Sequence, residues 1–257
     1  MLMDDRLIFD IGANHGEDSE HYLAQGYRVL AVEANPSLAG ELKEKFANQI
    51  REGEMVILDV GIGPHPGALD FFINESNDEH SSFDAVAGQR GGRWHTIPIL
   101  CTTMSALLKE YGVPYFLKVD IELADRVCIE ALSPIDLPAY VSIEAHDLSY
   151  LCVLWSLGYR KFKVVDQRGH NHPRVFDNET VRGRLAGKLE FYRRQVRNRS
   201  GRPQRFKPGS SGPFGEETVG PWVDLETAAY EWLHVKTKHT HRGTLDPSGW
   251  FDFHARI

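Results

Sequence analysis

Five acidic residues stand at the ends of apolar segments, where a carboxylate can bind a ligand or accept a proton. They are Asp10, Glu33, Asp59, Asp120 and Glu144. Ligands in open parallel sheets bind beyond the carboxyl ends of the strands. If the apolar segments are strands of one parallel sheet, these five residues meet at the same edge. The pattern therefore predicts a ligand site that is built by strand ends.

The first of these acids lies in the stretch "FDIGANHG", residues 9–16. Gly12 and Gly16 permit a tight turn and a close approach of the backbone to a ligand. Asn14 stands where dinucleotide-binding enzymes have the glycine that makes room for a pyrophosphate. Glu33 follows Gly12 by roughly the 20 residues that are typical of an acid holding ribose hydroxyls. The spacing indicates a nucleoside cofactor with an amino-acid end and no phosphate, and S-adenosylmethionine is such a cofactor.

Other groups at the strand ends suit methyl transfer to an oxygen nucleophile. A sulfonium methyl group is already electrophilic, so the protein must align the acceptor hydroxyl and remove its proton. The imidazole of a histidine has an unperturbed pKa of about 6.5, which suits proton removal at neutral pH. The candidate catalytic residues are Asp120, Glu122, Glu144 and His146.

Asp120 and Glu144 are also candidate ligands for Mg²⁺ or a similar hard cation, because such ions prefer oxygen ligands. Glu122 or His146 would complete the site. The alternative is that the acids orient substrate hydroxyls without a metal, and the sequence leaves both hypotheses open. The histidine-rich stretches "HNH" and "KHTHR" have no cysteine partner and do not indicate a zinc site.

Short apolar segments alternate with helical patterns along the chain, which predicts a parallel sheet with right-handed crossovers. The expected strands are residues 6–12, 27–34, 54–61, 114–120, 139–147, 161–166 and 249–257. The last strand follows a long excursion. These features predict an α/β fold of the Rossmann-like class I methyltransferase type, with a mostly parallel seven-stranded sheet and helices on both faces.

Local signals refine this outline. Asn35 is expected to cap a helix that Pro36 begins. Residues four apart in that helix predict one buried stripe, formed by Leu38, Leu42, Phe46 and Ile50. The segments "GALDFFINE" and "RWHTIPIL" predict a hairpin around a polar loop. Within that loop, residues 80–83 are expected to line the substrate side.

Composition limits the class of protein. The chain has 257 residues, of which 42% are hydrophobic and 25% charged, as in a soluble globular protein of one domain. A net charge of −7 argues against nucleic acid and anionic membranes as partners. No apolar run is long enough to span a bilayer. Cys101, Cys128 and Cys152 lie in apolar segments and are expected to be buried thiols of a cytoplasmic protein.

The single domain is expected to have three parts. Residues 1–166 form the cofactor-binding core, residues 167–249 a helical and loop excursion that shapes the substrate site, and residues 250–257 the final strand. Arg193 to Lys207 is a basic stretch in an otherwise acidic protein, and arginine binds phosphate and carboxylate well. The expected partner is therefore a small-molecule or glycan acceptor, of anionic type if this stretch binds it; the alternative is a solvated helix end.

The chain resembles the FkbM family of S-adenosylmethionine-dependent methyltransferases over roughly Leu7 to Asp147. The resemblance rests on "FDIGANHGEDSEHYLAQGYRVLAVEANP", "VILDVGIGPHPGALDFF", "HSSF", "LKVDIELADRVCIEAL" and "YVSIEAHD". It implies an O-methyltransferase acting on a sugar or natural product. The cofactor-binding residues on this reading are Asp10, Gly12, Asn14, Gly16, Glu33, Ala34, Asp59 and Asp120. Leu123 stands where the family usually has glycine, and Asp125 where glutamate is common, which puts the shape of this loop in doubt.

Three alternatives remain open at this stage. Gly12 and Gly16 could shape a plain strand-to-helix turn. The protein could be a nicotinamide-dependent Rossmann oxidoreductase, although Asn14 in place of the second glycine counts against it. It could also be a non-catalytic Rossmann-like binding protein, in which loss of the strand-end acids would be expected, and all five are present.

Overall fold

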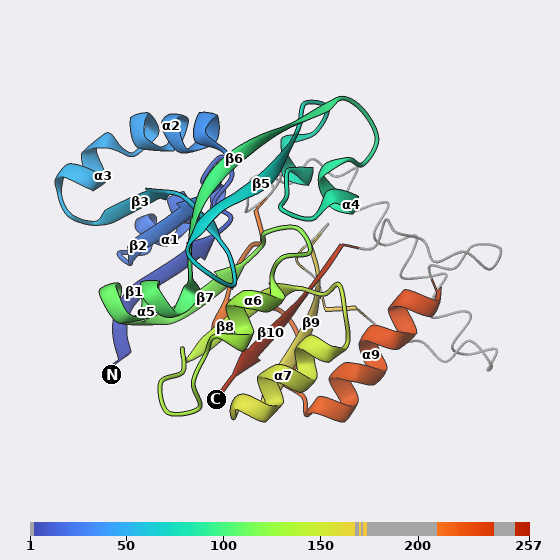
Figure 1. The fold of residues 1–257 in the computed structure, drawn as a ribbon. Helices are drawn as coiled ribbons and strands as arrows, with labels where there is room; N and C mark the ends of the chain where they lie inside the picture. The colour runs from blue at the N-terminus through green and yellow to red at the C-terminus, as the bar shows by residue number, and fades with distance from the viewer. Residues whose placement is uncertain (1–2, 168–169, 171, 174–209, 239–249) are drawn as a thin grey trace, which may run out of the picture.

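The computed structural model describes residues 3–167, 170, 172–173, 210–238 and 250–257. Within these residues, seven strands form one sheet in the order β3-β2-β1-β7-β8-β10-β9. All neighbouring pairs are parallel except those of β10, which runs antiparallel to β8 and β9. Figure 1 shows β10, in red, between these two strands. The predicted α/β class and the mostly parallel seven-stranded sheet are confirmed. The strands are β1 (Met3–Ile11), β2 (Arg28–Glu33), β3 (Met55–Asp59), β7 (Val113–Val119), β8 (Tyr140–Glu144), β9 (Lys161–Asp166) and β10 (Phe251–Arg256).

Helices cover both faces of this sheet, because successive strand residues point to opposite faces. In β1, Phe9 and Ile11 pack with α5, α6, α7 and α9, whereas Ile8 packs on the other face with α1 and α2. In Figure 1, α7 and α9 lie side by side below β9 and β10. The helices are α1 (Glu17–Ala24), α2 (Pro36–Lys45), α3 (Ala47–Arg51), α5 (Met104–Tyr111), α6 (Arg126–Glu130), α7 (Ser149–Leu157) and α9 (Leu225–Lys238).

The capping signals of α2 are confirmed, but the buried stripe is shorter than predicted. The side chain of Asn35 accepts a hydrogen bond from the Ser37 amide, and Pro36 is the first helical residue. Leu38, Leu42 and Phe46 are buried, whereas Ile50 is exposed. Because α2 ends at Lys45 and α3 begins after Phe46, the side-chain period changes there and Ile50 points to solvent.

The predicted hairpin is present as part of a second sheet. Strands β5 (Gly67–Asn74) and β6 (Trp94–Thr102) pair antiparallel, and β6 also pairs with the short strand β4 (Gly61–Ile62). Figure 1 shows these strands beside the main sheet. The polar loop between them contains η1 (Asp78–His80) and α4 (Ala85–Gly88). Ser82 hydroxyl donates a 2.5 Å hydrogen bond to the Glu122 carbonyl oxygen, so this loop is tied to the end of β7.

The expectation for one cysteine is wrong. Cys152 is exposed, although Cys101 and Cys128 are buried as predicted, because Cys152 lies on the outer side of α7. Within the described part of the excursion, residues 210–215 are buried, whereas Glu216 and Glu217 are exposed. Phe214, just before η2 (Gly215–Glu217), stacks on Phe116 with ring centroids 4.1 Å apart. An aromatic residue within a glycine- and serine-rich run thus replaces a helix on this part of the sheet.

Several sequence interpretations lie outside the described residues. They include much of the helical and loop excursion at residues 167–249 and the basic stretch at residues 193–207. In the part of the chain that is described, no helix has both the length and the apolar character needed to cross a bilayer.

We predict an acid sensitivity that originates at His254. This residue is 2% exposed in β10, between Ser142 and Lys163 of the neighbouring strands. Burial, reinforced by the charges of Lys163 and His170, lowers the pKa of His254 to about 3. The unfolded chain has an ordinary histidine pKa of about 6.5, so it binds a proton that the folded protein excludes, and stability falls as the pH falls below that value.

Between pH 7 and pH 5 the wild-type protein should lose about 2 kcal/mol of unfolding free energy that the His254→Gln variant keeps. Urea denaturation at both pH values measures this difference. The His65→Gln variant is the control, because His65 is exposed between β4 and β5. Equal losses in the wild type and in His254→Gln would show that His254 does not titrate in this way.

Candidate active site

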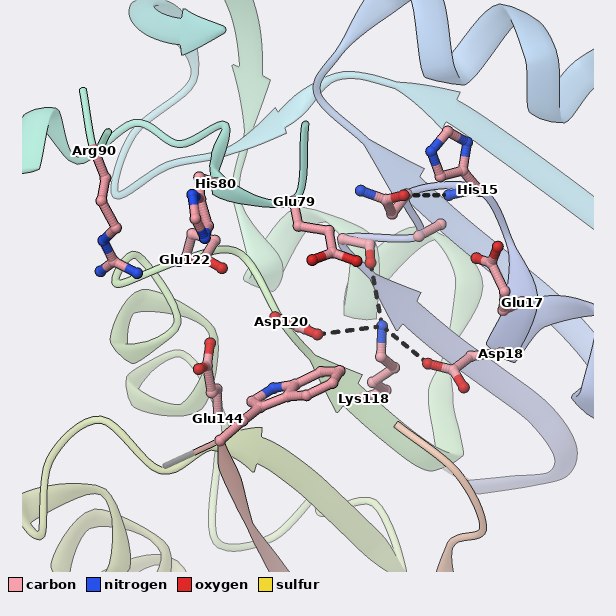
Figure 2. A pocket seen from close by; sticks show the side chains of 14 residues that line it. His15, Glu17, Asp18, Glu79, His80, Arg90, Lys118, Asp120, Glu122 and Glu144 are labelled. Atoms are coloured by element: carbon pink, nitrogen blue, oxygen red, sulfur yellow. Dashed lines mark hydrogen bonds and ion pairs between the residues drawn. The ribbon is translucent and has the colours of Figure 1, made fainter. Parts of the chain in front are cut away.

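The carboxyl ends of β1, β2, β7 and β8 meet at two adjoining cavities, as the sequence predicted. The larger has a volume of about 270 Å³ and the smaller about 60 Å³. Figure 2 shows the larger cavity, with His80, Arg90 and Glu122 on one side and His15 and Glu17 on the other. Five residues line both cavities, which makes them one continuous site. These are Gly12, Asn14, Glu79, Asp120 and Glu122.

The turn after β1 requires glycine at position 12. Gly12 has φ +83°, and a Cβ atom there would lie 1.8 Å from the carbonyl oxygen of Asp120. The ends of β1 and β7 therefore approach more closely than any side chain permits. Asn14 also has a left-handed backbone, with φ 47°, which asparagine tolerates better than most residues. At Gly12 the loop thus presents backbone without a side chain at the junction of the two cavities.

Glu33 holds this loop to the end of β2. Its Oε2 atom accepts a 2.8 Å hydrogen bond from the Asn14 amide, and Oε1 accepts one of 2.8 Å from the Asn35 amide. The side chain is almost buried, and burial raises the pKa of Glu33 although both amides oppose this. Each carboxylate oxygen can accept more than one hydrogen bond. Glu33 can therefore bind a ligand hydroxyl without losing its amide partners.

The smaller cavity has apolar walls around Glu33. Apolar side chains come from β2, from α2 and from the second sheet with its loop, so this part of the site suits a flat and weakly polar group. They belong to Val32, Leu38, Val60, Ile62, Phe71 and Phe83. The predicted substrate-side loop contributes to both cavities, His80 to the larger, Ser81 and Phe83 to the smaller.

A buried lysine crosses the floor of the larger cavity. The Nζ atom of Lys118 lies 3.1 Å from Asp10 Oδ1 and 3.4 Å from Asp18 Oδ2, and the side chains of both acids are almost fully buried. It also donates a 3.1 Å hydrogen bond to the carbonyl oxygen of Gly12 and lies 3.9 Å from Asp120 Oδ2 (Figure 2). These acids raise the pKa of Lys118 well above its ordinary value against the effect of burial, so the lysine stays charged.

Acidic groups gather at the ends of β7 and β8. Glu122 and Glu144 line the larger cavity, and the Nε2 atom of His146 lies 2.9 Å from Glu144 Oε2. Burial, followed by the charges of Glu144 and Asp120, raises the pKa of Glu122 to about 8. Burial raises the pKa of Glu144 to about 8 and that of the fully buried Asp125 to about 7. Carboxylates this crowded resist simultaneous ionisation.

The loop that carries Glu122 keeps a left-handed backbone. Glu122 has φ 50° and Leu123 has φ 69°. Glycine adopts this conformation freely, whereas leucine does so at a cost of about 1 kcal/mol or more. Leu123 therefore adopts the left-handed backbone that a glycine at this position would take without strain. The leucine has not abolished this loop conformation.

The structure places seven of the eleven sequence-predicted residues on the cavity walls. They are Gly12, Asn14, Glu33, Ala34, Asp120, Glu122 and Glu144. The other four lie outside the lining. Asp10 is buried beneath the floor, where Ser19 hydroxyl donates a 2.6 Å hydrogen bond to it. Gly16 packs against Leu42 and Phe46, where a Cβ atom would lie 2.7 Å from each side chain. Asp59 forms an exposed ion pair with Lys43, and His146 lies behind Glu144.

Sequence reasoning missed eight residues of the larger cavity, among them Asp18, Arg90, Lys118 and Trp250. Lys118 lies in the stretch "KVD", whose alternating pattern signals a strand but not a buried charge. Asp18 reads as an ordinary first-turn helix acid, yet it accepts hydrogen bonds from the hydroxyl of Ser210 and the amide of Ser211. These partners are distant in sequence, so no local pattern predicts them. The metal pair Asp120 and Glu144 stays a prediction; in the described residues Glu144 groups with Glu122 and His146, and Asp120 lies 3.9 Å from Lys118.

We predict that Lys118 and Asp10 stabilise the fold only as a pair. The Lys118→Met variant leaves buried carboxylates without their cation and should lose about 3–5 kcal/mol of unfolding free energy. The Asp10→Asn, Lys118→Met double variant should be more stable than the sum of the single effects, by about 1 kcal/mol or more. Urea denaturation of the four proteins measures this coupling. Lys109→Met, on the exposed side of α5, is the control, and strictly additive losses would contradict the pairing.

Comparison with known proteins places the chain in a family. No curated protein matches it. Among solved structures, the FkbM methyltransferase of Methylobacillus flagellatus KT is similar, with 17% identity and a TM-score of 0.41, over 63% of this chain and 40% of that one. A SAM-dependent methyltransferase from Archaeoglobus fulgidus is similar, with 11% identity and a TM-score of 0.41, over 99% of this chain and 87% of that one.

This chain thus spans about two fifths of the Methylobacillus protein, and with TM-scores this low the family match alone carries the assignment. The family model described as the methyltransferase FkbM domain matches residues 10–160. That range covers both strand ends that form the junction of the cavities, and it is more than half of the 257 residues. The protein therefore belongs to the FkbM family of methyltransferases.

Proposed function

We propose that the protein transfers a methyl group from S-adenosylmethionine to a hydroxyl of a sugar, glycan or other natural product. The observation that carries this proposal is the shared wall of the two cavities, at Gly12 and Asp120. A ligand that enters the apolar cavity at Glu33 extends past this wall into the larger, acidic cavity. A nucleoside joined to an amino acid has this shape and this distribution of polarity.

The residues present fit such a cofactor. The smaller cavity offers apolar walls for the adenine and the Glu33 carboxylate for the ribose hydroxyls. The floor of the larger cavity offers the charges of Asp18 and Lys118 to the zwitterionic amino-acid end. A Cβ atom at Gly12 would collide with the Asp120 carbonyl oxygen and so disturb the wall that the two cavities share. When bound, the cofactor supplies an electrophilic methyl group, and the protein has to provide alignment and proton removal.

Asp120 is the group best placed to orient the acceptor. It lines both cavities, and its side chain is 26% exposed, so an acceptor in the larger cavity can reach it. Glu122 and Glu144 line the far side of the same cavity. His146 does not line it and acts on an acceptor only through Glu144, which makes it a positioning residue in this proposal.

The nature of the acceptor is the finer part of the proposal. Arg90 lines the larger cavity close to His80 and Glu122, so a guanidinium is available to an anionic acceptor (Figure 2). The basic stretch at residues 193–207 stays a second candidate for this role. The proposal therefore includes an anionic small-molecule or glycan acceptor. It includes neither nucleic acid nor a membrane as partner, and it places the reaction in the cytoplasm.

We predict that Glu33→Ala weakens the binding of S-adenosylmethionine by about tenfold or more, because a buried hydroxyl–carboxylate hydrogen bond is worth about 1.5–3 kcal/mol. Isothermal titration calorimetry measures the affinity. Glu33→Gln, which keeps one acceptor oxygen, should give an intermediate value. Glu54→Gln is the control, since Glu54 is an exposed acid before β3. Unchanged affinity in Glu33→Ala would remove Glu33 from the site, and wild-type binding of a nicotinamide dinucleotide instead would overturn the proposal.

We predict that Asp120→Asn keeps cofactor affinity within about threefold and lowers kcat by about 100-fold. The amide keeps the shape of the side chain but loses its charge and basicity. Turnover is measured with labelled S-adenosylmethionine against a panel of sugars and natural products. Glu130→Gln serves as the control, because Glu130 is exposed and paired with Arg126. Normal turnover in Asp120→Asn would show that another group handles the acceptor.

A further inference from the structure

Four side chains from two segments converge at the ends of β7 and β8. We call them the carboxylate–histidine cluster: Glu122, Asp125, Glu144 and His146. Glu122, Glu144 and His146 each have one ligand atom that lies within 4.8 Å of the ligand atoms of the other two. Atoms that bind the same divalent cation lie about 3–5 Å apart, because each is about 2.0–2.6 Å from the ion. The spacing is that of a coordination site.

The atoms of this cluster lie close together without forming hydrogen bonds with one another. His146 Nε2 is 2.9 Å from Glu144 Oε2, yet it is buried and has no hydrogen-bond partner among the described residues. Buried polar groups rarely lack a partner, so each exception calls for an explanation. The Nε2 atom of His146 can therefore bind a third centre while it stays close to Glu144.

Asp125 supplies a second and independent observation. Its side chain is fully buried, and its Oδ1 atom accepts a 2.9 Å hydrogen bond from the Ile121 amide. The other oxygen, Oδ2, has no hydrogen-bond partner among the described residues and lies 3.7 Å from His146 Nε2. A buried, unpaired carboxylate oxygen is costly. This oxygen therefore lies near the same His146 atom as Glu144 Oε2 does.

Among the described residues, no lysine or arginine forms an ion pair with Glu122, Asp125 or Glu144. Lys118 is already occupied by Asp10 and Asp18. The left-handed backbone at Glu122 and Leu123 adds a conformational cost at the place where Glu122 turns toward Glu144. A divalent cation would compensate for both the crowded charge and the strained loop.

We propose that the carboxylate–histidine cluster binds one divalent cation, with Mn²⁺ preferred over Mg²⁺. Carboxylate oxygens suit Mg²⁺, Ca²⁺ and Mn²⁺, whereas one imidazole ligand shifts the preference toward transition metals. Asp120 is not a ligand in this arrangement, because it faces Lys118. The role of the ion rests on the proposed function: since Glu122 and Glu144 also line the larger cavity, the ion faces the bound acceptor.

The experiment measures metal binding directly and without turnover. Protein freed of metal with EDTA is titrated with Mn²⁺, and free Mn²⁺ is followed by electron paramagnetic resonance. We expect one Mn²⁺ per chain with micromolar affinity, and Mg²⁺ should compete more weakly. Glu122→Gln and Asp125→Asn should each weaken binding by about tenfold or more. Glu122→Gln is the safer variant for folding, because its side chain forms no hydrogen bond within the described residues.

A matched control separates ligation from general charge. Glu79→Gln removes a carboxylate of the same cavity that lies outside the cluster, and it should change Mn²⁺ affinity by less than about threefold. Circular dichroism checks the fold of each variant. Absence of saturable Mn²⁺ binding, or equal weakening in Glu79→Gln and Glu122→Gln, overturns the proposal and leaves a metal-free Glu144–His146 pair.

Calorimetry with S-adenosylmethionine in EDTA keeps this result separate from the proposed function. Cofactor binding without Mn²⁺ binding would refute the metal site and leave the methyltransferase proposal standing. Mn²⁺ binding without cofactor binding would support the metal site and refute the methyltransferase proposal.

Discussion

The ammonium group of Lys118 lies in the interior of the protein, and the site is arranged around it. It joins Asp10 at the end of β1, Asp18 of α1 and the carbonyl oxygen of Gly12. Charges removed from water are tolerated only when they are paired and hydrogen-bonded. The pairing therefore fixes the first strand, the first helix and the glycine turn relative to β7. The glycine turn also fixes the position of Asn14, whose amide donates a hydrogen bond to Glu33 at the end of β2.

This network also explains how a strongly acidic cavity stays folded. Asp10 and Asp18 share the lysine, and the serines at positions 210 and 211 donate further hydrogen bonds to Asp18. Glu122 and Glu144 form no ion pair with a lysine or arginine among the described residues, and burial together with neighbouring carboxylates raises their pKa values. Lys118 thus lies at the end of the cavity near α1, whereas Glu122 and Glu144 lie at the end near β8. The two ends suit different ligand groups.

The fold could be predicted wherever its cause is local. The apolar strand segments, the Asn35–Pro36 cap and the hairpin depend on neighbours in sequence, and the sheet follows from them. The prediction for Ile50 failed because a helix break is a matter of a few φ/ψ angles that the side-chain period does not reveal. The predicted wall residues were mostly right, since strand ends converge by topology. Lys118, Asp18 and Trp250 escaped prediction because their roles depend on partners that the chain brings from far away.

The antiparallel direction of β10 determines which residue of the C-terminal segment lines the larger cavity. Because β10 starts where β8 and β9 end, the residue before it, Trp250, enters the wall of the larger cavity. The glycine turn and Glu33 belong to the segment that matches the family, whereas Trp250 lies beyond it. The wall of the larger cavity is therefore completed by a residue from outside the segment that matches the family. A substitution at Trp250 can reshape this wall while the glycine turn and Glu33 stay unchanged.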